Sequence, residues 1–238
     1  MKEESDPDFE EKIEEEPSIE EEPSEKEQKQ YTLNSIFLLL GIIAIIGIIL
    51  FSIKLFAPKS IDDMIQEIAE KGETKNGYMY NGFVFLYQQD LWNTQWQYGD
   101  TMLNLHFHYG PRDVENIPLI GALANNTNLK RFYLTFDPDE QNMTLISLAA
   151  SELGLNLVKG MNVKLVPACT TNSTKECVDR PIVTCDNTNE SVIFVKTDDI
   201  SGVVFDNNCI TIKGPGNDLL KSVDKFLFRS YKIMTANN

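Results

Sequence analysis

The stretch from Arg131 to Val166 decides the fold, because it alternates between two kinds of pattern. RFYLTF (Arg131–Phe136) is a strand-prone run that ends at the loop Asp137–Asp139. NMTLISLAASELGLN (142–156) then carries apolar residues at helical spacing, and NVKLV (Asn162–Val166) is strand-prone again. A strand, a helix and a second strand in this order predict one βαβ-like crossover.

Toward the C-terminus the chain predicts short strands and one more helix. The β-prone runs between turn signals are Ile182–Thr184, Val192–Lys196, Gly202–Phe205 and Ile210–Lys213. The helix runs from Asn217 to Tyr231 and begins at an Asn-Asp cap. Its apolar side is predicted to carry Leu219, Leu220, Val223, Phe226 and Leu227.

Toward the N-terminus, residues 78–109 hold ten of the 23 aromatic residues and alternate in the period of half-buried strands. Asn81-Gly82 predicts a turn within this stretch. Strands clustered early and late, with few helices, predict an α+β fold over residues 76–234. We expect a mixed sheet with helices packed on one face. Residues 58–75 precede it and predict a short helix with a Ser60–Asp63 capping box, followed by a linker.

Further outward, residues 33–56 predict a single transmembrane helix. Ile36 to Ile53 contains no charge, and 24 residues span roughly 30 Å of hydrocarbon with some tilt. Tyr31 and Phe56 lie at the expected interfaces. A cleavable signal peptide is disfavoured, since the apolar stretch is long and follows 30 residues of acidic leader.

Residues 1–30 predict a disordered acidic tail, with 14 Asp or Glu against four Lys. We weighed two interpretations, a docking tail for a basic cytosolic protein and a merely solvated leader, and favour the second. The whole chain has a net charge of −15, which disfavours nucleic-acid binding because affinity for phosphate needs a basic surface.

The cysteines indicate the compartment, since all four follow the apolar stretch. An even count predicts two disulfides in an oxidising exterior, and three pairings are possible. We favour Cys169–Cys177, closing a polar loop, and Cys185–Cys209, tying two late strands. Four buried free thiols in a cytosolic domain are the alternative.

Glycosylation sequons point to the same side of the membrane, because all four follow the apolar stretch: Asn125, Asn142, Asn172 and Asn189. Asn172 is the best candidate, since it lies between two cysteines. The sequence therefore predicts a cell-membrane protein with its N-terminus in the cytoplasm and its C-terminal domain outside.

His106-x-His108 is the one motif with candidate chemistry. On a strand the two imidazoles share a face, and a metal site would add a carboxylate, for which we chose Asp113; Asp137, Asp139 and Glu140 are further candidates. We favour the alternative, two half-buried histidines on a sheet. The sequence identifies no catalytic residue and predicts no cofactor.

Trp92 and Trp96 lie on one face of a predicted strand. Exposed, they would form a binding face that stacks on sugars or on a partner chain. Buried, they would belong to the core under a helix layer, which is the more common arrangement and the one we favour.

The chain resembles a family of uncharacterised archaeal single-pass membrane proteins. The resemblance lies in LWNTQWQ, LHFHYGPRDVENIP, YLTFDPDE, LAASELGLNLV, RPIVTC and VDKFLFRSYKIM and covers residues 76–234. It implies an archaeal cell envelope, in which the sequons would be usable, and makes the cysteines part of a domain pattern. It implies no activity, so no site residue carries over.

Two functions remain from the sequence. The first is a membrane-anchored envelope protein whose disulfide-stabilised exterior domain acts as a binding or scaffold module, with an envelope protein or a glycan as partner and membrane lipid around residues 33–56. The second is a metal-dependent envelope hydrolase that uses His106 and His108. The absence of any enzyme signature favours the first.

Overall fold

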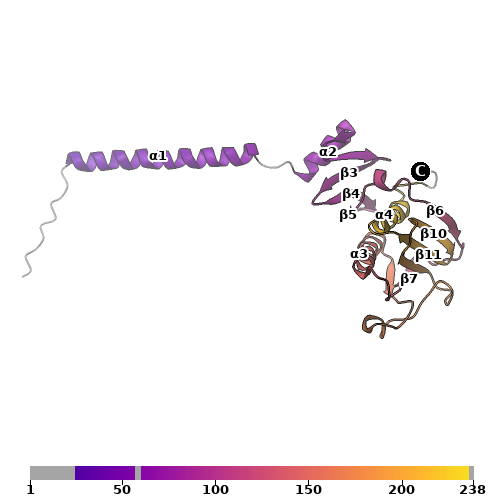
Figure 1. Cartoon of the computed structure of the whole chain (residues 1–238). Helices are drawn as coiled ribbons and strands as arrows, with labels where there is room; N and C mark the ends of the chain where they lie inside the picture. Colours follow the sequence, from indigo (N-terminus) through magenta and orange to yellow (C-terminus); the bar gives the residue numbers. More distant parts are fainter. Residues whose placement is uncertain (1–24, 57–59, 236–238) are drawn as a thin grey trace, which may run out of the picture. The chain divides into compact units, whose positions relative to one another are not determined.

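The computed structural model describes residues 25–56 and 60–235 (Figure 1). The chain divides into two compact units, Met1–Pro58 and Lys59–Asn238, which we describe separately. Residues 1–24, most of the predicted acidic tail, lie outside the described residues.

The first unit contains one long helix, α1 (Glu25–Phe56). It starts eight residues before Leu33, the predicted start, so residues 25–30 are helical and our assignment of them to the tail was wrong. Glu, Lys and Gln are good helix formers, and no proline lies between Pro23 and Pro58, which explains the extension. The Ser52 hydroxyl donates to the carbonyl of Ile48 at 2.7 Å, so this polar group is bonded within its own helix.

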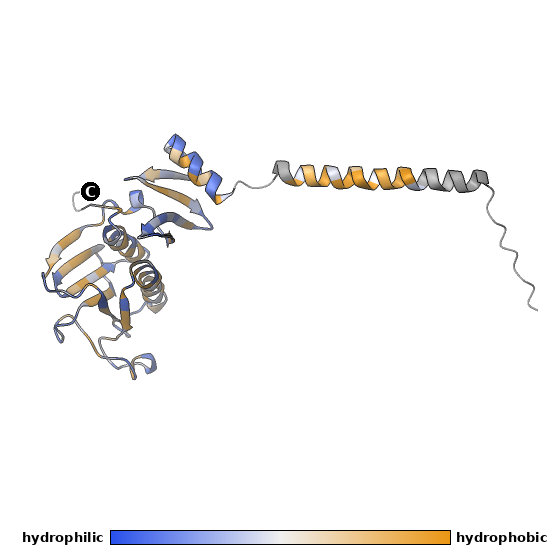
Figure 2. Ribbon diagram, turned by 180° about the vertical axis from the view of Figure 1, so that it is seen from behind, coloured by the Kyte–Doolittle hydropathy of each residue, from blue (hydrophilic) through white to orange (hydrophobic). Residues whose placement is uncertain are grey.

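Within α1, the apolar segment Ser35–Ile53 has the length and composition to cross a membrane. A signal sequence near an N-terminus has the same properties. Figure 2 shows the segment as a continuous hydrophobic band, and its side chains are not buried against protein.

The second unit begins with a helix and a five-stranded antiparallel sheet. Helix α2 (Ile61–Lys71) starts at the predicted Ser60–Asp63 capping box and ends at Gly72. The strands follow in chain order, each paired with the next: β1 (Glu73–Thr74), β2 (Gly77–Tyr80), β3 (Phe83–Gln88), β4 (Leu91–Tyr98) and β5 (Thr101–Phe107). Asn81 and Gly82 have φ of 48° and 84°, so the predicted turn is a tight hairpin turn of the kind that Asn-Gly favours.

A mixed six-stranded sheet has the order β6-β10-β11-β9-β7-β8. Its strands are β6 (Leu119–Leu123), β7 (Arg131–Phe136), β8 (Lys164–Pro167), β9 (Val192–Thr197), β10 (Gly202–Asn207) and β11 (Cys209–Gly214). The predicted crossover is confirmed: β7 and β8 are adjacent and parallel, and α3 (Met143–Gly154) joins them together with the π-helical turn η2 (Leu155–Gly160). Strands β10 and β6 run opposite to the other four.

The α+β class is confirmed, but the strands form two sheets and not the single mixed sheet that we expected. Short turns connect β2 to β5, so these strands pair with their chain neighbours. Residues 108–118, which include the 3₁₀ helix η1 (Pro111–Val114), then carry the chain to β6, an edge strand that the sequence analysis missed.

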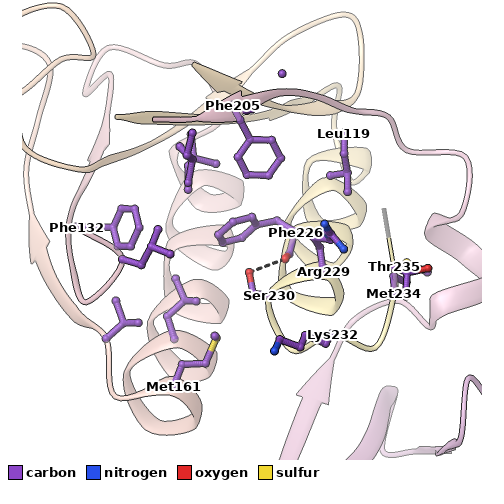
Figure 3. A pocket seen from close by; sticks show the side chains of 17 residues that line it. Leu119, Phe132, Met161, Phe205, Phe226, Arg229, Ser230, Lys232, Met234 and Thr235 are labelled. Atoms are coloured by element: carbon purple, nitrogen blue, oxygen red, sulfur yellow. Dashed lines mark hydrogen bonds between the residues drawn. The ribbon is translucent and has the colours of Figure 1, made fainter. Parts of the chain in front are cut away.

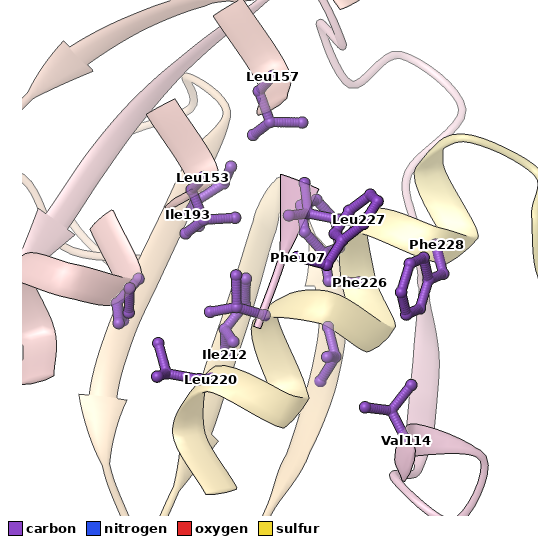
Figure 4. Close-up of a cluster of buried hydrophobic side chains, with 14 of the residues drawn as sticks. Phe107, Val114, Leu153, Leu157, Ile193, Ile212, Leu220, Phe226, Leu227 and Phe228 are labelled. Carbon is purple, nitrogen blue, oxygen red and sulfur yellow. The ribbon is translucent and has the colours of Figure 1, made fainter. Parts of the chain in front are cut away.

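Helices α3 and α4 (Asp218–Ser230) cover one face of the six-stranded sheet (Figure 1). Helix α4 is buried on more than the predicted side: Ser222, Asp224, Lys225 and Phe228 are buried together with the five predicted apolar residues. The ring of Phe228 lies 4.5 Å from Phe107 and 5.6 Å from Phe85, between centroids, so the five-stranded sheet packs on this helix as well. Figure 4 shows the joined core, in which α4 is the shared element.

The opposite face of the six-stranded sheet carries the segment between β8 and β9, which contains the 3₁₀ turn η3 (Lys175–Cys177). Disulfides link Cys169 to Cys177 and Cys185 to Cys209, which is the pairing that we favoured. The Thr135 hydroxyl donates to the Val183 carbonyl at 2.8 Å and fastens the segment to β7. The predicted strand Ile182–Thr184 is reduced to a single bridge between Ile182 and Cys169.

Candidate functional site

Within residues 25–56 and 60–235 the structure does not gather three of the predicted metal ligands, although His106 and His108 line the same cavity. His106 Nδ1 lies 2.5 Å from Asn93 Oδ1, and His108 Nδ1 lies 2.7 Å from Glu152 Oε2. The Asp113 carboxylate accepts a hydrogen bond from the Gly110 amide at 2.9 Å. Among residues 25–56 and 60–235, no group of three or more His, Cys, Asp or Glu side chains is placed to hold a metal ion.

His108 instead belongs to a buried acidic network. Glu152 of α3 accepts the His108 amide on Oε1 at 3.1 Å, and Asp224 of α4 accepts the next amide, that of Tyr109, on Oδ2 at 2.8 Å. Glu152 is 5% exposed and Asp224 is fully buried. Two successive amides at the end of β5 are therefore bound by one carboxyl group from each helix, which ties the five-stranded sheet to α3 and α4.

The pKa values of Asp224 and His108 in this network are shifted by their surroundings. Burial raises the pKa of Asp224 well above its usual value, and the neighbouring Glu152 carboxylate raises it further. The hydrogen bond to Glu152 raises the pKa of His108. A side-chain hydrogen bond with Glu152 raises the pKa of Asp224 as well, which favours its protonated form.

A cavity of about 320 Å³ lies beside His108, and several of its polar groups are hydrogen-bonded within the fold. The Ser151 hydroxyl donates to the Ser147 carbonyl on its own helix. The Asn156 side chain donates to the carbonyl of Glu152 at 3.0 Å. A histidine oriented by a carboxylate is a general acid–base arrangement, yet here both partners are bonded to backbone or to one another. We assign the network to fold cohesion.

Trp92 and Trp96 do not form an exposed binding face. Both are partly buried and pack against the core. The indole of Trp96 donates to the Tyr231 carbonyl at 3.2 Å, and its ring lies 5.0 Å from the Tyr231 ring. Trp92 packs against Tyr78, with ring centroids 4.9 Å apart. These contacts support the favoured interpretation of the two tryptophans as core residues.

All four sequon asparagines are exposed: Asn125, Asn142, Asn172 and Asn189. Asn172 lies in the loop closed by the Cys169–Cys177 disulfide, as expected. Asn142 caps α3 through Oδ1, which accepts a hydrogen bond from the Leu145 amide at 3.3 Å. The side-chain nitrogen of Asn142 takes no part in this hydrogen bond.

A second cavity, of about 730 Å³, lies between the six-stranded sheet, η2 and α4 (Figure 3). Its walls are mostly apolar and come from elements far apart in the sequence. Figure 3 shows Leu119 and Phe205 on the strand side, Phe226 projecting from α4, and Met161 beyond η2. Both its volume and its apolar walls are typical of small-molecule sites.

The polar residues of this cavity gather at the end of α4. Arg229 and Lys232 are exposed cations that line it, and no Asp or Glu lines it. The Ser230 hydroxyl donates to the Phe226 carbonyl at 2.8 Å, drawn as a dashed line in Figure 3. Sequence reasoning missed this cavity, because its apolar residues look like ordinary core and its cations look like solvated charges at a helix end.

Comparison with protein families, with characterised proteins and with solved structures found no match. The fold and the cavity are therefore interpreted from the geometry of this chain alone.

The Asp224 carboxyl group gives a pH-dependent prediction. Its pKa is raised in the folded state above the usual 3.8, so the folded chain binds more protons than the unfolded chain above that pH. This stabilisation is complete below pH 3.8 and is lost as pH rises through the folded pKa. Asp224→Asn keeps the shape and the acceptor for Tyr109, and we expect it to reduce the loss of stability between pH 4 and pH 8 by at least about 1 kcal/mol.

Urea unfolding of the full chain in detergent, followed by Trp fluorescence, measures this effect. The matched control is Asp179→Asn, which neutralises an exposed carboxylate and is expected to leave the pH profile unchanged. His108 contributes in the same direction above pH 6.5, so a residual slope remains there. An Asp224→Asn profile as steep as that of the wild type would show that Asp224 is ionised in the fold.

Proposed function

We propose that this chain is a membrane-anchored protein of the cell envelope whose C-terminal domain lies outside the membrane and binds an apolar ligand. The cavity of about 730 Å³ carries the binding part of the proposal. An open cavity of this volume with mostly apolar walls is typical of small-molecule sites, which supports a binding role.

Membrane anchoring is supported by the uncharged segment Ser35–Ile53 of α1. A helix bonds all of its backbone groups internally, which is the requirement for crossing hydrocarbon. The alternative role of this helix, a cleaved signal sequence, is disfavoured by the acidic leader that precedes it.

An exterior position for the domain is supported by its cysteines, which are all paired in disulfides. Disulfides persist in oxidising compartments and are rare in the cytosol. The exposed sequons also support an exterior position for the domain, and Asn172 lies inside a disulfide loop. An archaeal envelope follows from the sequence resemblance alone.

Binding is favoured over catalysis by the arrangement of the histidine side chains and of the other candidate metal ligands. The alternative, a metal-dependent hydrolase using His106 and His108, would need a third ligand, and no group of three or more His, Cys, Asp or Glu side chains within residues 25–56 and 60–235 is placed to hold a metal ion. The acidic tail stays a proposed docking segment for a basic cytosolic protein, and an envelope protein or a glycan stays a proposed further partner.

The side of the membrane can be tested by labelling lysines in intact cells with a membrane-impermeant amine reagent. We expect label on Lys175, which is exposed in the disulfide loop, and label on Lys2 and Lys12 only after lysis. Lysed cells are the control for reactivity. Label on Lys2 and Lys12 in intact cells, with none on Lys175, would reverse the proposed orientation.

The cavity can be tested with a photoreactive probe, a diazirine-bearing hexadecanol, added to the full chain in phosphatidylcholine vesicles. We expect crosslinks on peptides that contain Leu157 and Phe226, in addition to those on α1. Leu129 lines the cavity and is 59% exposed, so Leu129→Trp should obstruct the opening and lower this labelling at least about fivefold.

Ile200→Trp is the matched control, because Ile200 is 66% exposed and does not line the cavity. It should leave the labelling unchanged. Crosslinks confined to α1 in the wild-type chain would contradict a ligand-binding cavity in the domain.

A further inference from the structure

We propose that the cavity takes a single-chain amphiphile with a carboxylate head, and that Arg229 and Lys232 bind the head. This inference rests on the proposed function and names the ligand class of the same cavity. Three observations carry it: the apolar walls, the sign of the charges that line the cavity, and the backbone conformation that presents Lys232.

The walls fit an alkyl chain better than a polar metabolite. Phe132, Leu157, Phe205 and Phe226 supply apolar surface from β7, η2, β10 and α4. The wall residues offer no carboxylate, amide or imidazole side chain with which a polar ligand body could bond. Burial of apolar surface is then the main favourable contribution to binding of the ligand body.

The charged residues that line the cavity favour a ligand with a negatively charged head. The chain is acidic, with 36 Asp or Glu against 21 Lys or Arg, yet the two charged residues that line this cavity are both basic. Neither Arg229 nor Lys232 forms an ion pair within residues 60–235. Ser230 cannot assist an anion, because its hydroxyl hydrogen is already donated to the Phe226 carbonyl. The two cations, together with the exposed Thr235 hydroxyl, are therefore the polar groups that the cavity offers to an acidic head.

The end of α4 presents these cations in a specific way. Ile233 donates its amide to the Phe228 carbonyl at 2.9 Å, and Lys232 has a φ of 60°, which together form the capping turn that usually holds glycine. The helix dipole explains a cation at Arg229 in the last turn. Lys232 follows in the left-handed position and lines the cavity as well, so the end of α4 places two cations at the same cavity.

A carboxylate suits this pair of cations. The Arg229 guanidinium can bind both carboxylate oxygens through two parallel hydrogen bonds, and the Lys232 ammonium adds a point charge. Both side chains are exposed, so the head stays in contact with water while the chain is buried. That division is typical of amphiphile binding, because no charge has to be buried without compensation.

The test compares two photoreactive probes in phosphatidylcholine vesicles that contain the full chain. The acid probe is diazirine-bearing palmitic acid, and the neutral probe is the hexadecanol analogue. We expect the acid to label the peptides containing Leu157 and Phe226 at least fivefold more than the alcohol does at neutral pH. Labelling of α1 normalises for the amount of each probe in the bilayer.

The deciding variant is Arg229→Gln with Lys232→Gln, which should lower the acid labelling to the level of the alcohol and leave the alcohol labelling unchanged. The matched control is Lys75→Gln with Lys175→Gln, two exposed lysines that do not line the cavity, which makes the same change in net charge. The control should keep the preference for the acid.

The outcomes separate the two proposals. Equal labelling by acid and alcohol, or an acid preference that survives the Arg229 and Lys232 substitutions, would overturn the carboxylate proposal and leave the cavity as a binding site. Absence of cavity labelling with both probes would overturn the proposed function itself. Loss of the preference in the lysine control would assign it to net charge and not to these two residues.

Discussion

The packing of α4 between two sheets is the contact on which the rest of the domain depends. Nine of its residues are buried, including every position from Ser222 to Phe228. A helix buried on one face would leave part of that run in water. Here Val223 and Leu227 belong to the same core as the six-stranded sheet, while Phe228 meets Phe107 and Phe85 of the antiparallel sheet. Helix α4 thus contributes side chains to the core on both sides, and α3 adds its own contact with the five-stranded sheet through Glu152.

Burial of α4 from Ser222 to Phe228 also buries two charged residues, and the structure compensates each of them. Asp224 accepts the Tyr109 amide and lies beside Glu152, which raises its pKa. Lys225 donates to the carbonyl of Glu115 at 3.1 Å, and burial lowers its pKa. Removing one partner of such a network leaves an unsatisfied buried polar group, whose cost is about 1–3 kcal/mol. Polar residues thus fix where the antiparallel sheet attaches, and the apolar residues provide most of the stabilisation.

Local sequence patterns predicted individual helices and strands. Features that depend on long-range packing could not be predicted in this way. The stretch Arg131–Val166 contained its own strand, helix and strand signals, and Ser60 with Asp63 marked a helix start, so these were correct. The Cys185–Cys209 bond could be favoured because each cysteine flanks a β-prone run. Nothing local distinguishes Asp224 from a solvated charge, because the five-stranded sheet that buries it lies about 115 residues earlier in the chain. The cavity is equally invisible, since it is a gap between Phe205, Phe226 and Leu157 and not a motif.

Native-state hydrogen exchange of the full chain tests the central role of α4 most directly. If α4 is the core that both sheets share, the amides of β3, β5, β9 and β11 should exchange only through one global opening, together with those of α4. Their free energies of opening should then agree with one another and fall together in Phe228→Ala, which removes a fully buried ring and is expected to cost about 3–5 kcal/mol. Exchange of β3 and β5 at a distinctly lower free energy than β9 and β11 would contradict a shared core and show two independent layers.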